Sequence, residues 1–305
     1  MANLVTLADP TDFGNKPGDG PLRVGGVPGE PERGRDKPST RSPQSAQQKK
    51  ALGLCRDLWD GTDRVRMRAQ SYLPQAPGEK PQDYLNRLAR SVFFNAFRRT
   101  VEGLTGLVFR KDPELGEDVP PPIAEHWENI DNAGTHGDVF CRDLLEDDLT
   151  AGHAAILVEF PTTDGSQNAA VEMRGEVRPY WVPIKKDDIM SWRTRIEDGK
   201  TLLEQIVIRE SKYVPDGEFG TVLQVLYRVL FLTDVEGFEV GWKLLEEKDD
   251  GTVMVRGVGV YGNQTEIPVA EIISSGRRSL STVPRRSRIA SCWRSNRSAL
   301  PRFGA

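Results

Sequence analysis

Cysteine is scarce in this chain. Its 305 residues include three, Cys55, Cys141 and Cys292, which are odd in number and far apart. Such cysteines predict neither a disulfide framework nor a metal site, and they are typical of a cytoplasmic protein whose thiols stay reduced.

Long apolar runs are also missing. No stretch approaches the roughly 20 apolar residues that a helix needs to cross a bilayer. The first residues include Asp9 and Asp12 and contain no apolar core of the kind found in secretory signals. We therefore expect neither a membrane span nor secretion.

The motifs of several enzyme classes are absent. The sequence contains no G-x-x-x-x-G-K-[ST] phosphate loop and no G-x-S-x-G nucleophile motif. His126, His136 and His153 lack the spacing and the cysteine partners of a zinc site. These absences predict a protein that is not an enzyme and that uses no metal and no cofactor.

The first 50 residues are rich in glycine and proline. They hold seven of each and almost no aromatic residues. Such a segment buries too little apolar surface to offset the entropy of ordering it. We expect residues 1–50 to be a disordered arm.

Residues 51–152 predict a helical region. Its strongest element is a helix over 81–108, which Pro81 would begin because its missing N–H is not needed at the first helical position. Apolar side chains recur along it at helical spacing, at Leu85, Leu88, Val92 and Ala96.

A second helix is expected over 135–151. Thr135 and Asp138 resemble a capping box at its start, and Gly152 fits its C-terminal stop. The acidic residues of this helix, Glu146, Asp147 and Asp148, favour a solvated face or a subunit contact. The same interpretation applies to Asp187 and Asp188.

Residues 153–273 change to a period of two. Apolar and polar residues alternate over 221–232 and 238–244, and Asp250-Gly251 predicts a tight turn before the next strand. An antiparallel sheet that follows a helical region defines the α+β class. We expect the helix over 81–108 to pack with the sheet over 202–260, with a core that includes Leu88, Val92, Phe97, Tyr227 and Trp242.

Residues 274–305 differ from the rest of the chain. They contain eight arginines and eight serines but no Asp, Glu or Lys. Either this is a genuine basic tail that contacts nucleic acid, or it is an out-of-frame ending after about Ile273, which is the interpretation we favour. Without the tail, 33 basic residues face 45 acidic ones, a net charge of −12 that argues against a nucleic-acid-tracking protein.

Gly257, Gly259 and Gly262 spell the G-x-G-x-x-G of a dinucleotide site. Such a site needs a helix to begin at the glycines, whereas a turn and Pro268 follow here. We interpret the motif as a glycine-rich strand and turn, and a nucleotide-dependent enzyme as the weakest alternative.

Four arginines on the 81–108 segment are the candidate contact residues. Arg87, Arg90, Arg98 and Arg99 could contact DNA or a neighbouring subunit, and an ordinary solvated helix face would contain them equally well.

The stretch from Tyr72 to Arg110 reads YLPQAPGEKPQDYLNRLARSVFFNAFRRTVEGLTGLVFR. It closely resembles the start of a phage protein family, classed as a domain of unknown function, that is treated as portal-like. Three later stretches, over 138–161, 178–193 and 202–210, are similar to the same family. The resemblance covers roughly residues 52–273.

The resemblance implies a virion structural protein of a tailed bacteriophage or prophage, present in the host cytoplasm during assembly. Family members form a dodecameric ring at one capsid vertex, the head–tail connector, through which double-stranded DNA is packaged and ejected. Their partners are the terminase large subunit, the capsid and head-completion proteins. Helices followed by an antiparallel sheet resemble the wing region of such subunits.

Relatives continue past the sheet into channel-lining helices, and this chain departs from them near Ile273. We therefore expect a truncated portal-type subunit that does not close a stable ring. The alternative is a nucleic-acid-binding phage accessory protein that uses a genuine basic tail.

Overall fold

The computed structural model describes residues 37–117, 119, 121–159, 178–197, 200–235, 238–261 and 264–272. Helices occupy the N-terminal part and antiparallel strands the C-terminal part, which confirms the α+β class. Residues 1–36, residues 274–305 and Cys292 lie outside the described residues. Cys55 and Cys141 are free thiols, as expected.

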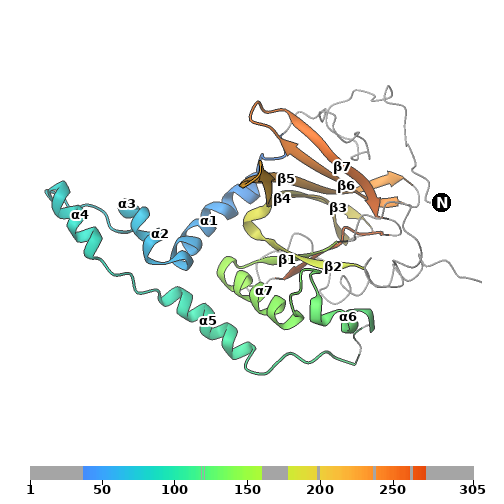
Figure 1. Ribbon diagram of the computed structural model, residues 1–305, viewed down its shortest axis with the longest axis horizontal. Coiled ribbons are helices and arrows are strands. Elements are labelled where there is room, and N and C mark those ends of the chain that lie inside the picture. Colours follow the sequence, from blue (N-terminus) through green and yellow to red (C-terminus); the bar gives the residue numbers. More distant parts are fainter. Residues whose placement is uncertain are drawn as a thin grey trace, which may run out of the picture.

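The strands form two antiparallel sheets (Figure 1). In the smaller one, β1 (Ala154–Glu159) lies between β2 (Tyr180–Lys185) and β8 (Val269–Ile272). The larger one is a meander in which each strand pairs with the next. Its strands are β3 (Ile189–Glu197), β4 (Lys200–Asp216), β5 (Gly220–Val235), β6 (Phe238–Glu247) and β7 (Val253–Tyr261).

The main core lies between the two sheets. Leu157 of β1 and Val269 of β8 pack in one cluster with Ile206, Leu230 and Val240 of the larger sheet. The expected alternation in β5 is correct, because Tyr227, Val229 and Phe231 are buried together. The opposite face of β5 is buried as well at Leu226, Leu230 and Leu232, so this part of the strand is covered on both faces.

A helical layer covers the outer face of the smaller sheet. Phe140 and Leu144 of α7 (Gly137–Ala151) pack on Ile156 and Trp181, and the ring of Trp127 joins them edge-on. Figure 1 shows α7 and α6 (Pro121–Glu125) beside β1 and β2 on this side. The short 3-10 helix η1 (Trp127–Asn129) connects α6 to the loop before α7.

Helix α1 begins at Pro43 and ends at Asp60, so the expected disorder of residues 1–50 is wrong for 43–50. Ser42 caps the helix by accepting a hydrogen bond from the Ser45 amide. The Ser45 hydroxyl then donates to the Ile189 carbonyl of β3 at 2.7 Å. A polar contact to the sheet therefore orders a segment whose composition favours disorder.

The expected helix over 81–108 is two helices, α4 (Pro81–Arg90) and α5 (Ala96–Val108). Ser91 is extended, and its carbonyl accepts from Arg66 at 2.6 Å, while Asn95 caps α5 and donates to the Leu58 carbonyl at 2.6 Å. These contacts hold residues 91–95 against the preceding helices, α1 and α2 (Thr62–Met67), and interrupt the helix. Helix α3 (Ala69–Tyr72) precedes the loop to α4.

The expected cap of α7 is also wrong by one residue. His136 is the N-cap, and its Nδ1 accepts from the Asp138 amide at 3.2 Å. The Thr135 carbonyl instead accepts from the Ile130 amide. Gly152 ends the helix in the left-handed conformation, with φ of 69°, as the sequence predicts.

Candidate interaction surface on the helical arm

Residues 81–108, here called the helical arm, extend from the two-sheet body. Figure 1 shows α4 at the far end of the arm and α5 running back toward α7. Helix α5 packs on α1 and α7, which corrects the expectation that this segment packs with the sheet over 202–260. Of the expected core residues, Tyr227 is buried and Trp242 packs against the core, but Val92 is 87% exposed.

Two of the four candidate arginines are paired within the chain. Arg87 donates to Glu79 at 2.8 Å, and this hydrogen bond lowers the pKa of Glu79 to about 2. Arg98 donates to Glu102 at 2.7 Å while its guanidinium lies over the Trp59 ring, 5.2 Å from the centroid. Arg87 therefore connects α4 to the preceding loop, and Arg98 connects α5 to α1.

Arg90 and Arg99 differ from that pair. Within the described ranges, no carboxylate lies at ion-pair distance from either guanidinium, and both residues are exposed. Arg99 lies over the ring of Phe94, 5.3 Å from its centroid. These two arginines are the members of the set that remain available for another molecule.

The arm also exposes large apolar side chains. Phe94 is 68% exposed and Val92 more so. Helix α4 buries Tyr84 alone, and α5 buries Val101 and Thr105. The remaining large apolar residues at the arm's surface are Leu85, Leu104, Leu107 and Val108. Apolar and aromatic side chains beside unpaired arginines are the composition of a contact surface.

Three carboxylates of the acidic clusters pair with cations of the protein itself, which corrects the expected solvated face at these positions. Asp147 of α7 and Asp187 of η2 (Lys186–Asp188) converge on Arg56 of α1, at 3.2 and 3.0 Å. Asp188 pairs with Arg209 of β4 at 2.7 Å. The two clusters therefore meet around cations of the protein itself and join α1, α7 and the sheet.

No metal site is present among the residues that the structure describes. His126 is partly buried, and that burial lowers its pKa. His153 is buried, and desolvation together with nearby Lys186 lowers its pKa to about 4. His136 caps α7, so the three histidines belong to separate surroundings.

The glycine motif makes room for a tryptophan. Gly259 lies opposite Trp242 in the β6–β7 ladder, and a Cβ at Gly259 would lie 2.8 Å from the indole nitrogen. A Cβ at Gly257 would lie 3.1 Å from the same ring. Both glycines are inside β7, so no helix begins there to receive a pyrophosphate. This geometry favours the glycine-rich strand over the dinucleotide site; Gly262 lies outside the described residues.

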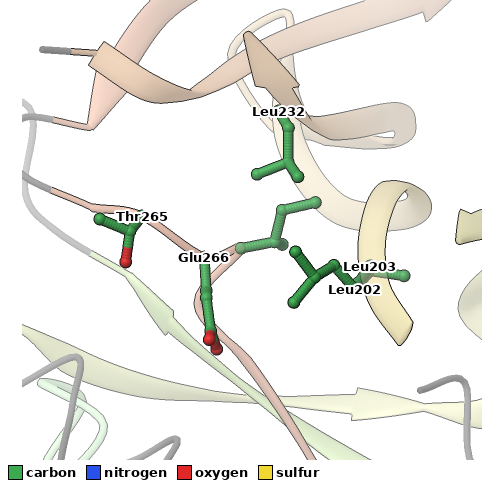
Figure 2. A pocket seen from close by; sticks show the side chains of 6 residues that line it. Leu202, Leu203, Leu232, Thr265 and Glu266 are labelled. Carbon is green, nitrogen blue, oxygen red and sulfur yellow. The ribbon is translucent and has the colours of Figure 1, made fainter. Parts of the chain in front are cut away.

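A small pocket lies between β4, β5 and the segment before β8. Figure 2 shows Leu202, Leu203 and Leu232 on one side of it and Thr265 and Glu266 on the other. Its cavity volume is about 10 Å³, close to the volume that a single water molecule needs. Ligand pockets usually measure about 300–1,000 Å³, so this one is no substrate site.

Sequence reasoning missed the polar residues that hold the body together. Arg228 of β5 contacts Glu159 of β1 at 2.9 Å and also donates to Glu210 of β4. Asp57 of α1 is 1% exposed. Its carboxylate forms ion pairs with Arg64 and Arg68 and accepts a hydrogen bond from the Tyr72 hydroxyl. The partners of Arg228 are distant in sequence, and those of Asp57 lie in or beside the separate short helices α2 and α3, so no local spacing could have identified them.

Among the described residues, no helix has the length and apolar character required to traverse a bilayer. No family model matches the chain. No curated protein is similar to it at a significant level.

Proposed function

We propose that this chain is a structural, non-enzymatic subunit of portal type from a tailed bacteriophage or prophage. The observation that carries the proposal is the position of the stretch from Tyr72 to Arg110, which resembles the portal-like family most specifically. Most of this stretch forms the helical arm, which lies outside the two-sheet body (Figure 1). A segment that is not used for the chain's own core is available for contacts with other molecules.

The body supports the same role. Two sheets buried against each other and a covering helical layer form a rigid scaffold of the kind that a structural subunit needs. In this role the subunit belongs to the virion, at the capsid vertex where double-stranded DNA enters with the terminase large subunit. Head-completion proteins and the capsid are the other expected partners.

Immunoelectron microscopy of phage particles tests the proposal. Antibodies raised against residues 178–272 should label particles at a single vertex, and peptides of the chain should be far less abundant than those of the major capsid protein. Antibody absorbed with the purified chain is the control. Label spread over the shell, or no label on intact and opened particles, would contradict the proposal.

Arg90 and Arg99 have no carboxylate partner among the described residues, which favours a second candidate function. This is an accessory protein that binds nucleic acid through the arm and the basic residues 274–305. That protein would bind double-stranded DNA with an affinity that falls steeply with salt, because bound arginines release counterions. Gel-shift titrations of the full chain and of the Arg90→Glu/Arg99→Glu variant at two salt concentrations decide between the two. Salt-independent, weak binding that the variant does not change favours the portal-type subunit.

A further inference from the structure

Much of the helical arm's apolar surface is uncovered within the described chain, although α5 packs on α1 and α7. Helix α4 has ten residues and buries only Tyr84. Isolated helices of this length are marginal in water, because few hydrogen bonds repay the ordering of the first turn. Its apolar surface therefore favours a state in which another surface covers the arm.

A second exposed surface lies at the end of β4 and β5. Residues 211–223, here called the β4–β5 ribbon, extend beyond the neighbouring strands, since β3 pairs with β4 only as far as Ile208 and β6 with β5 only from Tyr227. Phe219 is 91% exposed and Tyr213 75%, and Val222 and Leu223 are about half exposed. Such a ribbon offers aromatic side chains without contributing to the core.

The charges of the arm and of the turn at the end of the ribbon are complementary, and the basic Lys212 lies away from that turn. Arg90 and Arg99 of the arm have no acidic partner, and the exposed Asp216 and Glu218 of the ribbon have no basic one, within the described ranges. On each surface the charges accompany an exposed aromatic ring, Phe94 on the arm and Phe219 on the ribbon. Arginine and aromatic residues are the side chains enriched at protein interfaces.

We propose that the helical arm of one copy docks on the β4–β5 ribbon of a second copy of this chain, with Arg90 and Arg99 facing Asp216 and Glu218. The inference rests on the proposed function, since it names the contact by which portal-type subunits of this kind join. The two surfaces differ, so each contact leaves a free arm at one end and a free ribbon at the other. Copies would therefore add head to tail.

Charge reversal tests the contact on the full chain. Variant A carries Arg90→Glu and Arg99→Glu, and variant B carries Asp216→Arg and Glu218→Arg. In sedimentation velocity from 1 to 100 µM at low salt, the unsubstituted chain should sediment faster as its concentration rises. Each variant alone should stay monomeric, with an apparent dissociation constant at least tenfold higher, because like charges then face each other.

Mixing provides the sharper readout. In an equimolar mixture of A and B, every arm–ribbon pair between unlike copies is complementary, so association should return. A chain with all four substitutions should also self-associate. The matched control reverses two exposed charges elsewhere, Arg193→Glu and Asp249→Arg, and should leave association unchanged. Circular dichroism checks the fold, and the single-pair variants Arg99→Glu and Glu218→Arg repeat the test if a double variant unfolds.

Three results would overturn the inference: a monomeric unsubstituted chain at 100 µM, association that A and B do not weaken, or a mixture that stays monomeric. Binding of the arm to anionic lipid vesicles, lost in A, together with no self-association, would assign the arm to a lipid surface instead. If antibodies label a single vertex but variants A and B associate as the unsubstituted chain does, the proposed function stands and this contact is rejected. If mixing A and B restores association but antibodies label no vertex, the contact stands and the proposed function is rejected.

Discussion

The Tyr261 hydroxyl donates a hydrogen bond to the Glu159 carboxylate at 3.0 Å and joins β7 of the larger sheet to β1 of the smaller one. Burial, followed by the charge of Glu159, raises the pKa of Tyr261, so the phenol stays protonated as the donor. Arg228 contacts the other oxygen of the same carboxylate at 2.9 Å. The two sheets are therefore connected by a buried polar network in addition to their apolar core.

Replacement of Tyr261 with Phe should destabilise the protein by about 1–3 kcal/mol, because the buried Glu159 carboxylate loses one hydrogen-bond donor. Urea unfolding measures the free energy. Tyr213→Phe is the control, because Tyr213 is exposed and its hydroxyl donates no hydrogen bond to any residue that the structure describes. Its effect on the free energy of unfolding should stay within about 0.5 kcal/mol. Equal stabilities of the two variants would mean that the network contributes nothing.

Asp57→Asn should lower the free energy of unfolding by about 2–4 kcal/mol, because it weakens the contacts of α1 with α2 and α3. The buried Asp57 carboxylate lies 3.2 Å from Arg64, 3.0 Å from Arg68 and 2.7 Å from the Tyr72 hydroxyl, and a neutral amide cannot serve all three donors. Asp60→Asn, three residues further along α1, is the matched control because Asp60 is exposed and 4.0 Å from Arg64. Chemical unfolding should show the larger loss for Asp57→Asn.

Gly259→Ala should cost about 1–3 kcal/mol, because the new methyl group overlaps the Trp242 ring. Gly103→Ala in α5 has nothing within 4 Å of the new Cβ and should instead stabilise the protein by up to about 1 kcal/mol. Thermal unfolding and Trp fluorescence of the two variants provide the measurement. A neutral Gly259→Ala would show that the ring moves aside at no cost.

Acidification should destabilise the protein through His153, whose pKa is about 4 in the folded state and about 6.5 in the unfolded chain. The unfolded state binds the extra proton between these values, so stability is complete above pH 6.5 and falls as the pH decreases toward 4, by about 3 kcal/mol in total. Neither ring nitrogen has a hydrogen-bond partner among the described residues, so His153→Phe should fold. Its unfolding free energy should decrease less between pH 6.5 and 4 than that of the unsubstituted chain.

The order and the type of the elements could be predicted from local patterns. The strands β5 and β6, the turn at Gly251 and the stop at Gly152 each depend on a few neighbouring residues, and the structure has them where the sequence predicts them. The break at 91–95 could not be predicted in this way. It depends on Arg66 and on the Leu58 carbonyl, which approach that segment only after the helices have folded back.

The four candidate arginines show the same division. Their positions on a helix follow from periodicity. Only tertiary contacts separate Arg87 and Arg98, which pair with carboxylates, from Arg90 and Arg99, which have no carboxylate partner in the part of the chain that the structure describes. The sequence by itself determined the fold class and the basic, apolar character of residues 81–108, because side-chain chemistry and period are local properties. Only the tertiary structure decided which faces are covered, because burial depends on what distant segments pack against: the core encloses Tyr227 and leaves Val92 exposed.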